Sequence, residues 1–188
     1  AKRAITKNNS PDIGFDQSVN PYRGCEHGCS YCYARPTHCF MGLSAGLDFE
    51  TQLFAKLTAP ELLERELAVK NYVPKTIALG TNTDPYQPIE KHYGITRRIL
   101  EVLERHNHPV SIVTKSVLVA RDIDILQRMA KNNLVKVTLS VTTLSRRTAR
   151  KMEPRASAPH LRTKAIHELS DAGVSTAVMM APIVPAIN

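Results

Sequence analysis

The feature that most constrains the fold is a regular alternation of short apolar strands with helical patterns. Between the strand-like runs, apolar residues recur at helical spacing, as at Ile95, Ile99 and Leu103. The expected strands are 14–20, 76–79, 110–113, 135–141 and 174–180, and the expected helices are 58–71, 95–103, 122–129 and 159–172. This alternation is typical of a parallel sheet with right-handed crossovers, either doubly wound or part of a (β/α) barrel.

Local signals suggest where these elements begin and end. Thr58 is expected to cap the first long helix, with Glu61 reaching back, and Gly173 to end the last helix in a left-handed conformation. Residues 1–13 predict an irregular lead-in, and alternate apolar positions over 49–57 predict an extended segment. No composition break divides the chain, so residues 1–188 are expected to form one domain. Its end directly after a strand indicates a piece of a longer protein.

Three cysteines, Cys25, Cys29 and Cys32, lie in one loop at C-x3-C-x2-C spacing, with Gly24 and Gly28 freeing the backbone to wrap. Three thiolates in such a loop can converge on a soft metal centre. One possibility is a four-iron, four-sulfur cluster, in which three cysteines leave one iron open to a further ligand. The other is a closed zinc site, completed by Cys39, His27 or His38.

Composition supports a metal site and a basic surface. The chain has 188 residues, 43% of them hydrophobic, which is enough for a sizeable core. All four cysteines fall between positions 25 and 39, an arrangement typical of metal binding in a reducing compartment. With no long apolar run and no signal-like start, we expect a cytoplasmic protein without a membrane partner.

The net charge of +8 makes nucleic acid a candidate partner. The basic residues concentrate over 146–164, where Glu153 is the sole acidic residue. They are Arg146, Arg147, Arg150, Lys151, Arg155, Arg162 and Lys164.

Polar segments follow four of the expected strands. They are Gly80 to Pro88 (GTNTDPYQP), Thr114 to Ser116 (TKS), Ser140 to Thr143 (SVTT) and Ala181 to Pro185 (APIVP). Parallel strands end at the same edge of a sheet, and ligands of such folds bind there. These segments and the cysteine loop are therefore expected to form one site.

Together the motifs GCEHGCSYCYAR, GTNTDPYQPIE, TKS, LSVTT, MEPRA and APIVP resemble the radical S-adenosylmethionine (radical SAM) superfamily. The resemblance runs from about Asn20 to Val184 and is to the branch that includes spore photoproduct lyase, especially to bacterial proteins without an assigned substrate. It implies an α/β fold, a partial (β/α)6 barrel truncated at the carboxyl end.

The same resemblance implies an enzyme that uses a [4Fe-4S] cluster and S-adenosylmethionine. Reductive cleavage of S-adenosylmethionine would give a 5′-deoxyadenosyl radical that abstracts hydrogen from an unknown substrate, with electrons supplied by a flavodoxin- or ferredoxin-like donor. Cys25, Cys29 and Cys32 would hold the cluster. The implied cofactor-binding residues are Tyr31, Thr83, Asp84, Lys115, Ser140 and Arg155, and the implied catalytic residues are Tyr31 and Tyr33.

One position departs from the lyase pattern. Where spore photoproduct lyase has a cysteine that returns a hydrogen atom to the product radical, this chain has Thr81, whose O–H bond is too strong for that task. The alternatives are a nucleic-acid-directed radical SAM lyase or repair-like enzyme, and a non-catalytic zinc-binding module that needs Cys39 or His38.

Overall fold

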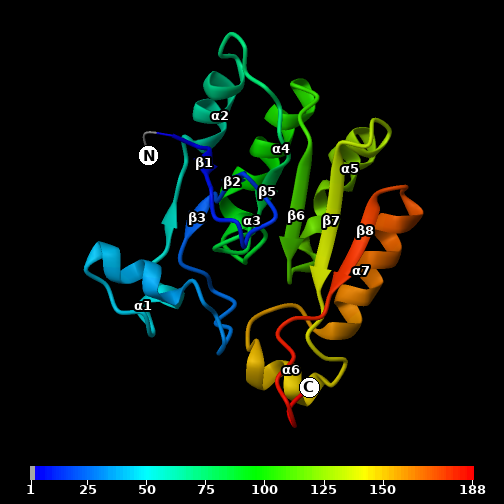
Figure 1. Ribbon diagram of the computed structural model, residues 1–188. Coiled ribbons are helices and arrows are strands. Elements are labelled where there is room, and N and C mark those ends of the chain that lie inside the picture. The colour runs from blue at the N-terminus through cyan, green and yellow to red at the C-terminus, as the bar shows by residue number, and fades with distance from the viewer. Residues whose placement is uncertain (1–2) are drawn as a thin grey trace.

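The computed structural model describes residues 3–188 and contains a twisted six-stranded sheet (Figure 1). The strand order is β1-β2-β5-β6-β7-β8, with β2 to β8 parallel in this sheet and β1 antiparallel to β2 at its edge. The bounds are β1 Thr6–Lys7, β2 Gln17–Val19, β5 Ile77–Leu79, β6 Val110–Thr114, β7 Val135–Ser140 and β8 Ser175–Met179. The five predicted parallel strands are therefore confirmed.

Helices cover one face of this sheet, as Figure 1 shows for α4, α5 and α7. The long helices are α2 Ala59–Leu67, α4 Ile95–Arg105, α5 Ile123–Ala130 and α7 Pro159–Asp171. Their apolar faces pack on the strands, and Ile77, Ile99 and Leu126 are completely buried there. Burial of one such side chain stabilises the fold by about 1.5–3 kcal/mol. The packed face fixes the register of the strands, and the opposite face is left for a cavity.

Short elements surround the cysteine loop and the carboxyl ends of the strands. They are β3 Tyr22–Arg23, η1 Arg35–Met41, α1 Asp48–Thr51, β4 Phe54–Ala55, α3 Glu90–Tyr93, η2 Val117–Asp122 and α6 Arg146–Met152. β3 and β4 pair as a separate two-stranded ribbon. Among residues 3–188, no helix is both long and apolar enough to cross a membrane.

Three local predictions were wrong. The lead-in 1–13 contains β1, because Ala4 and Ile5 are held by backbone N–H bonds to the Glu66 carboxylate and the chain then pairs with β2. Segment 49–57 is not extended throughout, since α1 occupies its start and places Phe49 in a small core. Thr58 makes no side-chain cap to α2, and the helix ends at Leu67 instead of Asn71.

Two glycines have a left-handed backbone next to long elements. Gly173 follows α7 with a φ of 79°, so the predicted left-handed end of this helix is confirmed. Gly80 directly follows β5 with a φ of 90°, and a Cβ there would overlap the carbonyl oxygen of Val113 in β6. Glycine therefore allows the close approach of β5 and β6 where the candidate site begins.

Candidate functional site

The cysteine loop is held in place by hydrogen bonds from neighbouring elements. Gln87 binds it twice, because its Nε2 donates to the Gly24 carbonyl at 3.0 Å and its Oε1 accepts from the Glu26 N–H at 3.0 Å. The Cys25 N–H donates to the Phe49 carbonyl at 2.9 Å. Gly24 and Gly28 have φ values of 76° and 65°, which the wrapped path requires.

All three motif cysteines line one cavity of about 100 Å³, together with Tyr31 and Lys115. Cys25 and Cys29 are buried and Cys32 is partly buried, whereas Cys39 is exposed and does not line this cavity. Burial raises the pKa of Cys29 to about 12, so metal binding would displace its proton. Within residues 3–188, no three side chains of His, Cys, Asp or Glu are arranged so that they could already hold one metal ion.

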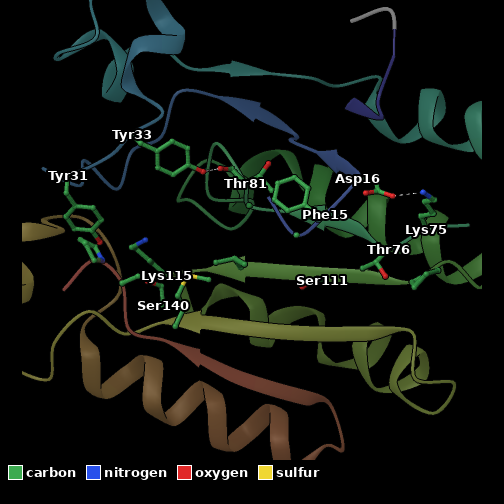
Figure 2. A pocket seen from close by; sticks show the side chains of 18 of the residues that line it. Phe15, Asp16, Tyr31, Tyr33, Lys75, Thr76, Thr81, Ser111, Lys115 and Ser140 are labelled. Carbon is green, nitrogen blue, oxygen red and sulfur yellow. Dashed lines mark hydrogen bonds and ion pairs between the residues drawn. The ribbon is translucent and has the colours of Figure 1, made fainter. Parts of the chain in front are cut away.

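A larger cavity of about 1050 Å³ follows the sheet face that the helices leave uncovered (Figure 2). Tyr31, Tyr33, Thr81 and Lys115 line both cavities, so they form the boundary between them. At the far end lies the exposed Lys75–Asp16 ion pair, with a 2.5 Å separation. The arrangement offers one compartment beside the thiols and a second compartment large enough for a substrate.

Two polar side chains face these cavities without a protein partner. The Lys115 ammonium lies 5.7 Å from the centre of the Tyr31 ring and forms no ion pair with any residue in 3–188. The Ser140 hydroxyl is buried and has no hydrogen-bond partner in the described chain. Because unsatisfied buried groups are costly, the Ser140 hydroxyl is suited to a polar ligand, and the partly exposed Lys115 ammonium adds a positive charge beside it.

The two tyrosine hydroxyls are engaged. Tyr31 donates to the Glu153 carboxylate and lies 3.4 Å from the Thr142 hydroxyl, and Tyr33 donates to the Thr81 carbonyl. Glu153 also pairs with Arg162 at 2.5 Å, and both side chains are 1% exposed. Burial and the hydrogen bond to Glu153 raise the pKa of Tyr31, so it remains a phenol at neutral pH. Tyr33, in contrast, is 76% exposed.

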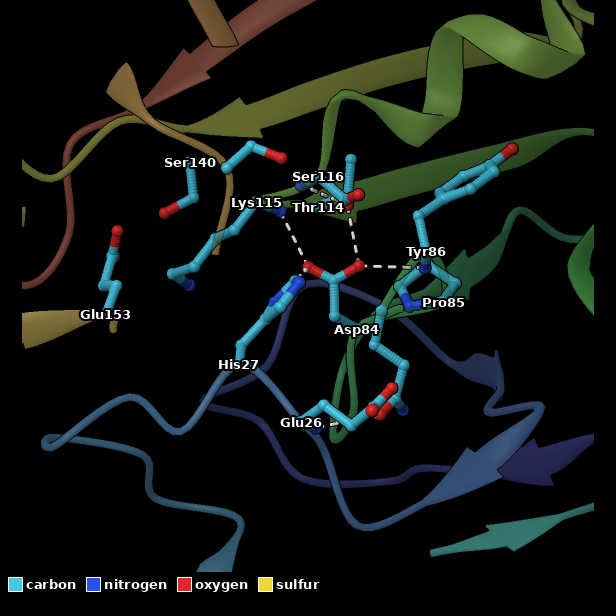
Figure 3. A network of polar contacts seen from close by, with 12 residues as sticks. Glu26, His27, Asp84, Pro85, Tyr86, Thr114, Lys115, Ser116, Ser140 and Glu153 are labelled. Atoms are coloured by element: carbon cyan, nitrogen blue, oxygen red, sulfur yellow. Dashed lines mark hydrogen bonds and ion pairs between the residues drawn. The ribbon is translucent and has the colours of Figure 1, made fainter. Parts of the chain in front are cut away.

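Asp84 forms a buried ion pair with His27 of the cysteine loop (Figure 3). Its carboxylate lies 3.3 Å from His27 Nδ1 and accepts from the Lys115 N–H and the Thr114 hydroxyl, each at 2.7 Å. Burial alone would lower the pKa of His27, but the Asp84 charge outweighs it and raises that pKa to about 10. His27 and Asp84 thus join the loop to the ends of β5 and β6.

The remaining predicted site residues are bonded to the loop or its surroundings. Thr83 is buried and donates its hydroxyl to the Tyr22 carbonyl at 3.0 Å. The Arg155 guanidinium donates to the Glu26 carbonyl and pairs with Glu50. The structure therefore places Tyr31, Thr83, Asp84 and Lys115 around the cysteine cavity and Ser140 on the larger cavity, whereas Arg155 lines neither.

Sequence reasoning did not predict the roles of His27 and Glu153 as hydrogen-bond and ion-pair partners of the site residues. His27 was considered only as a zinc ligand, and Glu153 only as a local charge among the basic residues. Both lie inside segments that carried the family resemblance, GCEHGCSYCYAR and MEPRA, so their position within the motifs was the available signal. Asp84, the partner of His27, is distant in sequence, and Arg162, the partner of Glu153, is nearby. In both cases only the fold shows the pairing.

Sequence comparison links the chain to one superfamily over most of its length. The model of the radical SAM superfamily matches residues 19–188. An uncharacterised protein of Mycobacterium tuberculosis is 36% identical over 188 residues, which are 100% of this chain and 55% of that protein. One from Methanocaldococcus jannaschii is 27% identical over 185 residues, 98% of this chain and 66% of the relative. The chain spans about half the length of the mycobacterial relatives it matches.

Solved structures show the same fold. Spore photoproduct lyase complexed with dinucleoside spore photoproduct matches 98% of this chain and 50% of its own, with a TM-score of 0.70 and 18% identity. A mutant of that lyase with bound AdoMet and dinucleoside spore photoproduct matches 94% of this chain and 48% of its own, with a TM-score of 0.64 and 18% identity. This likeness and the mostly parallel sheet confirm the predicted α/β partial barrel.

Proposed function

The chain belongs to the radical SAM superfamily, and we propose that it binds a [4Fe-4S] cluster and S-adenosylmethionine and cleaves the latter reductively. The observation that carries this proposal is the cavity shared by the three motif cysteines and Lys115, next to the larger compartment on the open sheet face. When bound, the cluster would supply one electron to S-adenosylmethionine and so produce a 5′-deoxyadenosyl radical that abstracts hydrogen from a substrate.

The donor set fits this pair of cofactors. Cys25, Cys29 and Cys32 would hold the cluster, and three thiolates leave one iron for S-adenosylmethionine. Exposed Cys39 has no part in this set. A closed zinc site requires a fourth protein ligand. Cys39 and His38 do not line the cavity, and His27, which does, is paired through its Nδ1 with the Asp84 carboxylate.

Lys115 and Ser140 are the residues we assign to the methionyl end of S-adenosylmethionine. Lys115 can neutralise the carboxylate, since its ammonium lacks an acidic partner among residues 3–188 and faces both cavities. Ser140 can donate or accept through its unpartnered hydroxyl. Thr83 lines the cysteine cavity, and Tyr31 offers an aromatic wall beside Lys115.

Asp84 and Arg155, both assigned to cofactor binding on the resemblance, are proposed to act by positioning. Asp84 holds the Lys115 backbone and His27, whereas Arg155 holds the Glu26 carbonyl. Tyr31 and Tyr33 are proposed as catalytic residues because their phenols stand between the two compartments. There they can exchange a hydrogen atom with a substrate, and the partly buried Tyr31 can limit the access of water.

The proposal implies further partners. The cluster requires a reductant, for which a flavodoxin- or ferredoxin-like protein is suitable, and a reducing cytoplasm would protect the thiols. Nucleic acid is the second candidate substrate class, because the net charge is +8 and the lyase structures are named with a dinucleoside photoproduct. Thr81 stands where the lyase has its hydrogen-donating cysteine, so the lyase reaction is not carried over.

The test is anaerobic reconstitution with iron and sulfide, followed by dithionite, S-adenosylmethionine and assay of 5′-deoxyadenosine. We expect product from the wild type, loss of cluster and product in Cys29→Ala, and retention of both in the matched variant Cys39→Ala. A fully loaded four-iron protein that gives no 5′-deoxyadenosine would contradict the proposal. Zinc retained in place of iron, and lost in Cys39→Ala, would support the binding-module alternative.

A further inference from the structure

Four exposed cations on α6 form a surface that we call the α6 patch: Arg146, Arg147, Arg150 and Lys151. None of them forms an ion pair with another residue in the described range 3–188. Between positions 125 and 167 the sole acidic residue is Glu153, and its carboxylate is buried against Arg162. The patch therefore presents uncompensated positive charge.

Part of this charge opposes the helix. Arg146 and Arg147 lie in the first turn of α6, where positive charge is unfavourable to the helix dipole and no acidic residue offsets it. Arg146 and Arg150 are also spaced i,i+4, as are Arg147 and Lys151, and like charges at this spacing repel. The buried residues of α6, Ala149 and Met152, provide its packing instead. The charges of Arg146 and Arg147 are therefore better explained by an anionic partner than by the fold.

The α6 patch borders a groove of about 540 Å³ that runs toward the start of α7. Pro154, Ser157 and Pro159 contribute its uncharged walls. This groove has no lining residue in common with the 1050 Å³ cavity on the sheet face. The patch is thus separate from the compartment that we assign to the substrate.

The end of α6 is bonded directly to the cysteine loop. The Met152 carbonyl accepts from the Ser30 N–H at 2.9 Å and lies 3.4 Å from the Ser30 hydroxyl. Ser30 stands between Cys29 and Cys32 in the chain. The next residues continue the contact, because the Arg155 N–H donates to the His27 carbonyl at 3.2 Å. A partner seated on the patch would therefore lie beside the cluster ligands.

We propose that the α6 patch is the docking surface for a small acidic electron-carrier protein. This inference rests on the proposed function, which requires a reductant. One electron would pass from the reduced carrier to the cluster that the cysteine loop would hold. This transfer would oxidise the carrier and reduce the cluster, and no covalent bond would form or break. Opposite charges would speed the encounter, and salt would slow it.

The experiment compares two double charge reversals in the anaerobically reconstituted protein. Arg147→Glu with Arg150→Glu changes the patch, and Lys131→Glu with Lys136→Glu applies the same change of charge to exposed lysines at the amino end of β7. The probe is a reduced acidic flavodoxin. Its binding is measured by fluorescence anisotropy with a labelled flavodoxin, and its reoxidation by stopped-flow absorbance.

We expect the patch variant to lower both the affinity and the second-order rate constant at least about tenfold at low salt, and to flatten their salt dependence. The lysine variant should behave as wild type. With dithionite, which needs no docking, both variants should reduce and cleave S-adenosylmethionine at the wild-type rate. Failure of the proposed function would appear as absent 5′-deoxyadenosine despite normal flavodoxin binding and reoxidation.

Three outcomes would overturn the inference. Unchanged flavodoxin binding in the patch variant would remove the patch as its docking surface. An equal fall in the dithionite rate and the flavodoxin rate would show a general effect on the site. If the patch variant instead lost binding of a labelled single-stranded DNA oligonucleotide and kept that of flavodoxin, the patch would be a nucleic-acid surface.

Discussion

Gly28 shows how closely a single residue of the cysteine loop is confined. Its φ is 65°, and a Cβ at this position would overlap the Arg155 guanidinium and lie 2.8 Å from Glu50 Oε2. Gly42 has a similar φ of 73°, yet a Cβ there would have nothing within 4 Å. A side chain at Gly42 would meet backbone strain alone, whereas a side chain at Gly28 would meet backbone strain and steric crowding.

We predict that Gly28→Ala lowers the free energy of unfolding more than Gly42→Ala. The left-handed backbone should cost each variant about 1–2 kcal/mol. Gly28→Ala should add a further cost because Arg155 must leave Glu26 and Glu50. Urea unfolding of the two variants measures the difference, and equal losses would show that Arg155 moves freely.

Single residues also show where sequence reasoning stops. Motif spacing and the ends of the strands predicted that the three cysteines and Lys115 lie together, and all four line one cavity. The orientation of Asp84 could not be predicted. It lies in a turn-like segment, and the partner that orients its carboxylate, His27, comes from a distant loop.

Among the elements, α7 is joined to β7 and to the cysteine loop by one buried arginine. Arg162 donates to the Ser140 carbonyl at 2.7 Å and pairs with Glu153, which in turn accepts from Tyr31. Arg98 and Glu61 form a comparison pair between α4 and α2, with side chains 42% and 52% exposed. Loss of the arginine should therefore lower the free energy of unfolding more in the buried Arg162–Glu153 pair than in the exposed Arg98–Glu61 pair.

We predict that Arg162→Met lowers the free energy of unfolding by about 3–5 kcal/mol at pH 7, because Glu153 is left buried and unpaired. Arg98→Met should cost about 0–1 kcal/mol. Burial raises the pKa of Glu153, but the Arg162 charge and the hydrogen bonds to the carboxylate outweigh burial and lower that pKa in the folded protein.

The stabilisation from Glu153 is therefore present at neutral pH and is lost as the pH falls through its folded pKa. In Arg162→Met the remaining burial should raise the pKa of Glu153, so this side chain takes up a proton at a higher pH in the variant than in the wild type. The stability gap between wild type and Arg162→Met should therefore narrow as the pH falls from neutral. Denaturant titrations across pH test this, and a constant gap would contradict it.

The elements that sequence patterns could predict are those with enough length to show a period. Five parallel strands and four long helices were found in this way, because their buried faces repeat. β1 has only two residues, and its pairing depends on Glu66 in α2. α6 has just two buried residues, Ala149 and Met152, so its sequence showed a basic stretch without a helical pattern.

For the whole molecule, the main hydrophobic core is separate from the cysteine loop. The core unites the strands and long helices, whereas Cys25 packs in a small second cluster with Ala34 and Phe49. The sheet consequently does not depend on the cysteines for its packing. Loss of a cofactor held by the loop should have a local effect.

We predict that removing iron with a chelator increases hydrogen exchange in residues 24–52 and leaves the amides of β5, β6 and β7 protected. The loop would lose its ligand contacts, while the strands keep their buried apolar faces. Hydrogen-exchange mass spectrometry of the loaded and stripped protein measures this. Exchange rising equally in the strands would mean that the cluster stabilises the whole domain.

The long-range hydrogen bonds of the cysteine loop also limit when the loop can reach its final structure during biosynthesis. The Ser30 hydroxyl and the Met152 carbonyl are 122 positions apart, and the Arg155 guanidinium and the Glu26 carbonyl are 129 positions apart. Contacts of such high sequence separation close late in folding, after much of the chain has left the ribosome. The loop therefore lacks these contacts while α6 is still being synthesised, and under the proposed function the cellular machinery that delivers iron and sulfide is expected to load it after translation.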